Sequence, residues 1–172
     1  VPYHSRFVEV NLRFYIRRRA AEGWRRGVAF VRELAPKRMV AVMANALYGE
    51  RYLAVPMTHE VTPGSGGVPR RLTYGWRYRG GLGEVTLEPA GEALPLAAES
   101  HEEYIAEHYW GYSSHRGRGV EYEVAHPPWR YSPAVRASFA CDHVGAIYGD
   151  AWREALGGEP RSAFWADGSA VR

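Results

Sequence analysis

Residues 7–17 read Phe-Val-Glu-Val-Asn-Leu-Arg-Phe-Tyr-Ile-Arg, a stretch in which apolar and polar side chains alternate. An alternation with a period of two is typical of a β-strand whose two faces meet different surroundings. We therefore predict a long strand here. Its apolar face would carry Val8, Val10, Leu12, Phe14 and Ile16, and its polar face Glu9, Asn11, Arg13 and Tyr15.

The segment after this strand predicts a hairpin and then a helix. Gly27 to Leu34 has the composition of a returning strand, and Ala35-Pro36 stops it. Proline suits the first turn of a helix, and apolar residues then recur at helical spacing up to Gly49, a suitable C-cap. We expect one amphipathic helix over about residues 36–48.

The rest of the chain predicts further strands and two more helices. Ser100-His-Glu-Glu103 has the form of a capping box that opens a helix through about Tyr109. Strands are expected over 52–57, 71–79, 83–88, 120–126 and 134–142, and a last helix over 147–156. Helices alternate too rarely for a parallel doubly wound sheet. We expect an α+β fold that is mainly β, a bent antiparallel β-barrel or sheet with a few external helices.

The composition indicates one folded domain and argues against a membrane or nucleic-acid partner. The chain has 172 residues, 46% of them apolar, and no stretch approaches the ~18 uninterrupted apolar residues of a membrane span. The net charge is only +3, and the densest arginine runs, 17–19 and 25–26, resemble the solvated tip of a hairpin. A phosphate-bearing partner stays a minor hypothesis. The single Cys141 fits a reducing cytoplasm, where we expect the protein.

The polar face of the first strand has two interpretations, and the residues do not decide between them. In a two-faced sheet, Glu9, Asn11, Arg13 and Tyr15 face water. In a barrel, the interior can be the polar face that lines a cavity, while the apolar face packs on helices. In that second arrangement, Glu9 and Arg13 would orient a small carboxylate or carbonyl ligand.

Lys37 is the only lysine among the 22 basic residues, so it is the one candidate for chemistry that needs a side-chain amine. A nucleophilic amine must be unprotonated, and an adjacent cation such as Arg38 disfavours the ammonium form. The alternative is a surface lysine in a first helical turn. The seven histidines include no His-x-x-x-His or His-x-His pair, and we expect no metal and no cofactor.

Several segments resemble the YqjF-like family, the domain of unknown function DUF2071, and occur in the family's order. They are Phe7–Tyr15, Gly27–Glu33, Leu47–Tyr52 with Pro56-Met57, Glu107–Tyr112, His126–Trp129, and Ser162–Phe164 with Asp167–Ser169. The resemblance implies a fold similar to that of acetoacetate decarboxylase, a bent antiparallel barrel around a cavity. It also implies a part ahead of Val1, so we expect a single YqjF-like domain over residues 1–172 that lacks its N-terminal strands.

The family has no assigned activity, so what the resemblance implies about function comes from the decarboxylase relatives. These use a Schiff-base lysine beside a cavity glutamate and arginine. Glu9 resembles the cavity glutamate, and Lys37 with Arg38 loosely resembles their lysine pair. A lyase acting on a small oxo-acid would then form an imine at Lys37. Glu9 would position the substrate or move a proton, and Arg13 would hold its carboxylate.

Two non-catalytic alternatives stay open beside the lyase. In the first, a barrel cavity binds a small organic anion through Arg13, Asn11 and Tyr15, and Lys37 lies on the surface. In the second, the protein is a structural or partner-binding module whose strand edges pair in a homo-oligomer.

Overall fold

The computed structural model describes residues 7–168 and shows the mainly β fold that the sequence predicts. Strands hold 49% of the chain and helices 19%. The described chain divides into two compact units. Unit 1 comprises residues 7–55 and 107–127, and unit 2 comprises residues 56–106 and 128–168.

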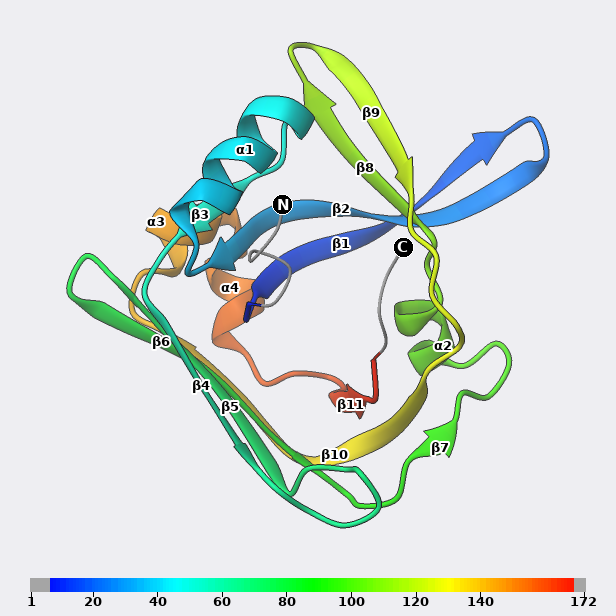
Figure 1. The fold of residues 1–172 in the computed structure, drawn as a ribbon, viewed down its shortest axis with the longest axis vertical. Coiled ribbons are helices and arrows are strands. Elements are labelled where there is room, and N and C mark those ends of the chain that lie inside the picture. The colour runs from blue at the N-terminus through cyan, green and yellow to red at the C-terminus, as the bar shows by residue number, and fades with distance from the viewer. Residues whose placement is uncertain (1–6, 169–172) are drawn as a thin grey trace. The chain divides into compact units, whose positions relative to one another are not determined.

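Unit 1 is a five-stranded sheet built on the long first hairpin (Figure 1). Strands β1 (Val10–Ala20) and β2 (Gly23–Ala35) pair antiparallel along their whole length. The other strands are β3 (Tyr52–Ala54), β8 (Trp110–His115) and β9 (Arg118–Glu123). β8 and β9 form a second antiparallel hairpin, but β2 pairs in parallel with both β3 and β8. These two parallel pairings add to the mainly antiparallel hairpins that the sequence predicts.

The alternating stretch forms its strand about three residues later than expected. β1 begins at Val10, so Glu9 directly precedes the strand. The register moves from Leu12 opposite Arg32 to Arg13 opposite Phe30, which leaves one extra residue on β2 as a bulge. The apolar face is only partly covered, since 45% of Phe14 is exposed. The strand is confirmed, and its apolar face is less buried than a simple two-faced sheet would have it.

Helix α1 (Arg38–Tyr48) confirms the predicted helix to within two residues. Lys37 occupies the N-cap position, directly after the end of β2. The C-terminal end of the helix is tied to unit 1 by Ser113 of β8, whose hydroxyl donates a hydrogen bond to the Tyr48 carbonyl at 2.9 Å. Ala41 is the one buried residue of the helix, and Met39, Val42 and Leu47 are exposed.

Unit 2 is a curled, antiparallel six-stranded sheet (Figure 1). Its longer strands are β4 (Met57–Thr62) at one edge, β5 (Arg71–Tyr78), β6 (Gly81–Pro89) and β10 (Arg130–Cys141). The short strands β7 (Leu94–Pro95) and β11 (Phe164–Ala166) pair with the beginning of β10. The sequence predicts β5, β6 and β10, whereas the expected strand over 52–57 is divided between β3 and β4.

The helices of unit 2 are shorter than their sequence patterns suggest. Helix α2 (His101–Ala106) has the predicted cap, in which the Ser100 hydroxyl accepts a hydrogen bond from the Glu103 N–H at 3.0 Å. It ends before Glu107 rather than near Tyr109. The expected helix over 147–156 consists of α3 (Val144–Tyr148), the 3₁₀ turn η1 (Asp150–Trp152) and α4 (Arg153–Gly157). Within residues 7–168, no helix has the length and apolar character that crossing a membrane requires.

Candidate functional site

The structure places the four polar residues of the first strand in different surroundings. Asn11 is exposed, and Glu9 is half-buried with its Oε1 atom shielded from solvent. Arg13 donates from Nε to the Tyr15 hydroxyl at 3.3 Å, and its guanidinium lies 5.6 Å from the centroid of that ring. The Tyr15 ring in turn meets His108 edge-on at 5.5 Å. Arg13 and Tyr15 therefore form one group, and Glu9 belongs to another.

Lys37 is half-buried at the start of α1, and its Nζ atom lies 5.6 Å from the centroid of the Phe7 ring. An aromatic face attracts a cation, so this contact suits an ammonium group. Arg38, the neighbouring cation, is exposed. The arrangement described for Lys37 is therefore a contact with an aromatic ring at a strand-to-helix junction.

Glu9 instead belongs to a cluster of acidic and phenolic side chains that the sequence pattern does not predict. We call it the glutamate cluster, and it consists of Glu9, Glu33, Glu50, Tyr52 and Tyr122. All five belong to unit 1, but they come from the residue just before β1, the end of β2, the turn after α1, and strands β3 and β9. No local motif marks such a set, because the members meet only through strand pairing and the turn that ends α1.

Strand pairing brings Glu33 and Tyr52 together. The parallel register of β2 and β3 sets Glu33 opposite Tyr52, and the Glu33 N–H donates to the Arg51 carbonyl at 3.2 Å. Asn45 of α1 holds β3 from its other side. Its amide donates to the Tyr52 carbonyl at 2.9 Å, and its carbonyl accepts from the Tyr52 N–H at 2.8 Å. The two bonds replace a missing neighbouring strand, so Tyr52 is fixed against Glu33.

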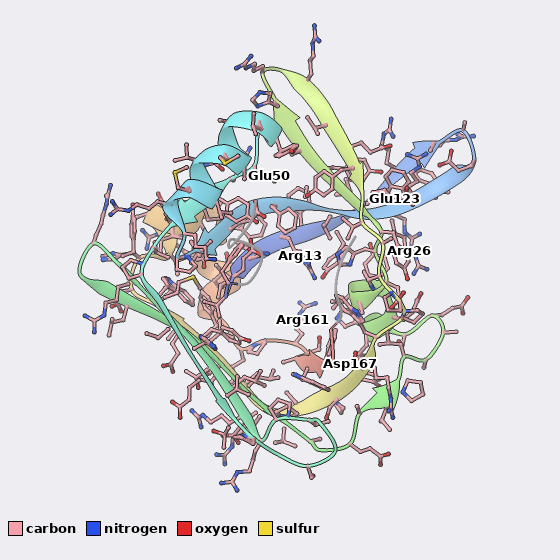
Figure 2. All side chains as sticks on the ribbon, in the orientation of Figure 1. Arg13, Arg26, Glu50, Glu123, Arg161 and Asp167 are labelled. Atoms are coloured by element: carbon pink, nitrogen blue, oxygen red, sulfur yellow. The ribbon has the colours of Figure 1, made fainter. Side chains whose placement is uncertain are left out.

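Glu50 is placed by the way in which α1 ends. Gly49 adopts a φ of 67°, the left-handed conformation, and its N–H closes the helix on the Ala44 carbonyl. A Cβ on Gly49 would lie 2.5 Å from the Ser114 carbonyl oxygen, so β8 also leaves room only for glycine. The chain turns sharply at this point and carries Glu50 back toward β2 and β3. Figure 2 shows Glu50 beside the end of α1 and Arg13 apart from it on β1.

Tyr122 is placed by a glycine on the facing strand. The β8–β9 register sets Gly111 opposite Tyr122, and a Cβ on Gly111 would overlap the tyrosine ring. The ring therefore lies flat over the glycine backbone. The Tyr122 hydroxyl reaches the Glu50 carboxyl, to which it is hydrogen-bonded.

The cluster concentrates like charges away from water. Burial, followed by the charges of Glu50 and Glu9, raises the pKa of the Glu33 carboxyl to about 8. Burial also raises the pKa of Glu50, while hydrogen bonds from Tyr122 and Glu33 lower it. With its pKa raised to about 8, the Glu33 carboxyl holds a proton at neutral pH beside the carboxyl of Glu50. Burial and the adjacent carboxylates raise the pKa of both tyrosine hydroxyls.

The hydrogen bonding of the cluster is incomplete. Glu33 is 4% exposed, and its Oε2 atom is buried without a hydrogen-bond partner among the described residues. The Oε1 atom of Glu9 is likewise buried without a hydrogen-bond partner among these residues. The Tyr52 hydroxyl is hydrogen-bonded to the carboxyls of both Glu9 and Glu33. One hydroxyl group cannot provide a partner for all four of their oxygens. Buried polar atoms are bonded in most folded proteins, and an exception at a cavity wall points to a missing partner.

A cavity of about 510 Å³ opens beside the cluster, within unit 1. It is lined by Glu33, Ala44, Tyr48, Glu50, Tyr52, Val120, Glu121 and Tyr122. This described lining holds three carboxyl groups, three phenols and no basic side chain.

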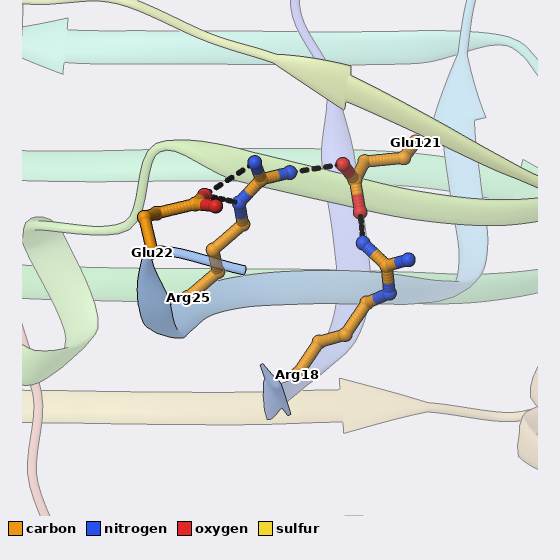
Figure 3. A network of polar contacts seen from close by, with 4 residues as sticks. All are labelled: Arg18, Glu22, Arg25 and Glu121. Carbon is orange, nitrogen blue, oxygen red and sulfur yellow. Dashed lines mark hydrogen bonds and ion pairs between the residues drawn. The ribbon is translucent and has the colours of Figure 1, made fainter. Parts of the chain in front are cut away.

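The third carboxylate of the lining, Glu121, already has counter-charges. Arg18 and Arg25 both form ion pairs with Glu121, and Arg25 also pairs with Glu22 (Figure 3). The guanidinium of Arg25 lies over the Trp110 ring at 3.8 Å from its centroid. The sequence predicts that the arginines of the hairpin tip are solvated. Two of them, Arg18 and Arg25, instead form ion pairs with Glu121 of β9. Glu33 and Glu50 have no such partner in the cavity lining.

Unit 2 contains a cavity of about 720 Å³ whose charged groups lie at the surface. Arg71 in its lining is bound to Glu88 at 2.8 Å, and Arg136 and Arg161 are exposed. Nowhere in residues 7–168 do three or more His, Cys, Asp or Glu side chains form a group that could hold a metal ion.

The fold and the cavity together define a mainly β protein with an acidic, tyrosine-lined pocket in one of its units. The chain belongs to the DUF2071 family, described as an uncharacterized conserved protein, which matches residues 1–170. A comparison with curated proteins found no match. The resemblance noted in the sequence is confirmed at the level of this family. Of the segments that carried it, Ser169 lies outside the described residues.

Proposed function

We propose that this protein binds a small molecule in the cavity of unit 1, with Glu33 and Glu50 as the polar anchors. The observation that carries the proposal is the Oε2 atom of Glu33, which is buried at the cavity wall and has no hydrogen-bond partner in the described part of the chain. A buried, unsatisfied polar atom costs about 1–3 kcal/mol. A ligand that donates a hydrogen bond to this atom would remove that cost.

The size and lining of the cavity support a small organic ligand. A volume of about 510 Å³ lies within the range of small-molecule sites, which are mostly apolar and contain a few convergent polar groups. Aromatic surface comes from Tyr48, Tyr52 and Tyr122. The carboxyls would fix the orientation of a ligand through hydrogen bonds. The carboxylates disfavour an anion at this place, so the organic anion expected from the sequence would need a different site.

The test is a titration followed by amide NMR with four named probes: glycerol, choline, 3,3-dimethylbutan-1-ol and acetoacetate. We expect at least one probe to shift the resonances of Glu33, Glu50 and Tyr52 in a saturable manner. Ala44→Phe should fill the cavity and abolish the shifts, whereas Ala46→Phe, on the exposed side of the same helix, should keep them. If no probe moves these resonances, or if Ala44→Phe leaves binding unchanged, the proposal is wrong.

A second candidate keeps the imine chemistry at Lys37 within an acetoacetate-decarboxylase-like fold. The half-buried position of this only lysine and the half-buried Glu9 support it. In that reaction, Lys37 would condense with the ketone of an oxo-acid and release water. Arg13, with Asn11 and Tyr15 nearby on β1, would hold the carboxylate.

Borohydride reduction tests this second candidate. The protein is incubated with acetoacetate or pyruvate and reduced, and its intact mass is compared with that of Lys37→Ala. A mass gain that the variant loses would establish the imine at Lys37. A gain that persists in the variant, or no gain in the parent protein, would exclude chemistry at this residue.

A further inference from the structure

We infer that the ligand of the unit 1 cavity is an organic ammonium ion, held between the carboxyls of Glu33 and Glu50 and the faces of the surrounding tyrosines. This inference rests on the proposed function, because it names the class of molecule that the cavity would bind. Two features of the described residues support it, the charge and the aromatic lining of the cavity, and the proton held by Glu33 supplies a readout in solution.

The charge of the lining favours a cation. Among residues 7–168, the cavity wall contains Glu33, Glu50 and Glu121 and no lysine, arginine or histidine. Glu121 is neutralised by Arg18 and Arg25, so its charge is already balanced. Glu33 and Glu50 face the cavity with no basic residue in its lining. An ammonium group supplies both the positive charge and the N–H or polarised C–H donors that the Glu33 oxygen lacks.

The aromatic lining favours an organic cation over a bare metal ion. Three tyrosines, Tyr48, Tyr52 and Tyr122, contribute to the wall, and aromatic faces attract alkylammonium groups in water-excluded sites. A metal ion would instead need several oxygen ligands at about 2.0–2.6 Å in a defined geometry. The described residues form no group of three that could provide it.

The proton that Glu33 holds at neutral pH gives the inference a second readout. Glu33 faces the carboxyls of Glu9 and Glu50 and the hydroxyls of Tyr52 and Tyr122, with the Arg51 backbone as a further partner. A cation between Glu33 and Glu50 favours their ionised forms, so its entry expels the proton that Glu33 holds. Binding should therefore release close to one proton at neutral pH, and the affinity should rise with pH.

The experiment compares each ammonium ion with a neutral molecule of the same shape. Choline is paired with 3,3-dimethylbutan-1-ol, and ethanolammonium is paired with 1-propanol. Titration calorimetry is run at constant ionic strength near pH 6.5 and pH 8.5, in two buffers of different ionisation enthalpy. We expect at least one ammonium ion to bind about tenfold or more tightly than its neutral partner, more tightly at the higher pH, and with proton release.

Two variants and a matched control locate the effect. Glu33→Gln and Glu50→Gln should each weaken ammonium binding by about tenfold or more and abolish proton release. Glu123→Gln removes the same charge from β9 at an exposed position outside the cavity lining and should change neither. Two variants are used because one could fold poorly, and the comparison of charged and neutral probes needs no variant at all.

Each outcome separates this inference from the proposed function. If the neutral alcohols bind as tightly as the ammonium ions, the cavity is a ligand site but the ammonium inference is wrong. If ammonium binding is unaffected by both Glu33→Gln and Glu50→Gln, the inference is wrong as well. If neither the ammonium ions, the alcohols nor glycerol bind, the proposed function fails together with it.

Discussion

Glu33 and Tyr52 are cross-strand neighbours in a parallel pairing, and this relationship organises the candidate site. Glu33 is buried at the end of β2, and Tyr52 lies beside it on β3. The Tyr52 hydroxyl is hydrogen-bonded to the carboxyls of Glu9 and Glu33. The pairing leaves one Glu33 oxygen without a partner. The site is therefore built by a short strand of three residues that Asn45 of α1 holds in place.

The titration of Glu33 predicts how stability depends on pH. Its pKa is raised to about 8 in the folded protein, so between about pH 4.5 and pH 8 the folded state holds a proton that the unfolded state has lost. Stability must then fall as the pH rises through this window, by on the order of a few kcal/mol. Glu33→Gln removes this group, so the free energy of unfolding in urea should decline less between pH 5 and pH 8.5. A parallel decline in the variant and the parent protein would contradict the prediction.

Gly111→Ala should damage the site through Tyr122. The added Cβ would overlap the ring, which must move away from β8. Overpacking of this kind costs about 1–3 kcal/mol. Gly119→Ala on β9 is the matched control, because its Cβ meets nothing within 4 Å. Thermal unfolding of both variants checks the prediction, and equal melting temperatures would refute it.

Asn45→Ala should loosen β3. The change removes two hydrogen bonds to the Tyr52 backbone, at 2.9 and 2.8 Å, each worth about 1 kcal/mol. Asn45→Asp keeps the acceptor for the Tyr52 N–H but loses the donor. Its rate of amide exchange at Tyr52 should therefore lie between the rates of Asn45→Ala and the parent protein. Amide hydrogen exchange at Tyr52 measures the loosening directly. Unchanged exchange in Asn45→Ala would show that β3 does not depend on this side chain.

Ser100→Ala should destabilise α2. The serine hydroxyl accepts the Glu103 N–H at 3.0 Å, and the loss of such a cap costs about 1 kcal/mol. Ser100→Asp keeps an acceptor at the same position and should retain most of the stability. Chemical denaturation compares the three proteins, and the prediction does not hold if the alanine and aspartate variants behave alike.

Sequence pattern predicts those elements of the fold whose signals are local. The alternation of residues 7–17, the helical spacing after Pro36 and the capping box at Ser100 each lie within a dozen residues, and each corresponds to an element of the structure. Strand β8 was missed because Trp-Gly-Tyr-Ser-Ser-His shows no alternation. It becomes a strand through its pairing with β2 and β9.

The candidate site could be predicted only in part. Glu9 was singled out from its strand, and it does lie in the glutamate cluster, next to Tyr52. Glu33 and Glu50 gave no signal, since a single glutamate at a strand end or after a helix is ordinary in a surface position. Glu33 is placed by the parallel pairing of β2 with β3, and Glu50 by the turn that ends α1, and both arrangements bring distant segments together.

Local chemistry alone therefore established a mainly β protein with a long first hairpin and a capped helix, because propensities and side-chain periodicity act between near neighbours. The tertiary structure alone decided which polar residues meet. Arg13 is hydrogen-bonded to Tyr15, its neighbour on the polar face of the first strand, whereas Glu9 from the same face joins Glu33 and Glu50. The physical reason is that burial and like-charge repulsion depend on distances through space, which strand register sets and which spacing along the chain does not reveal.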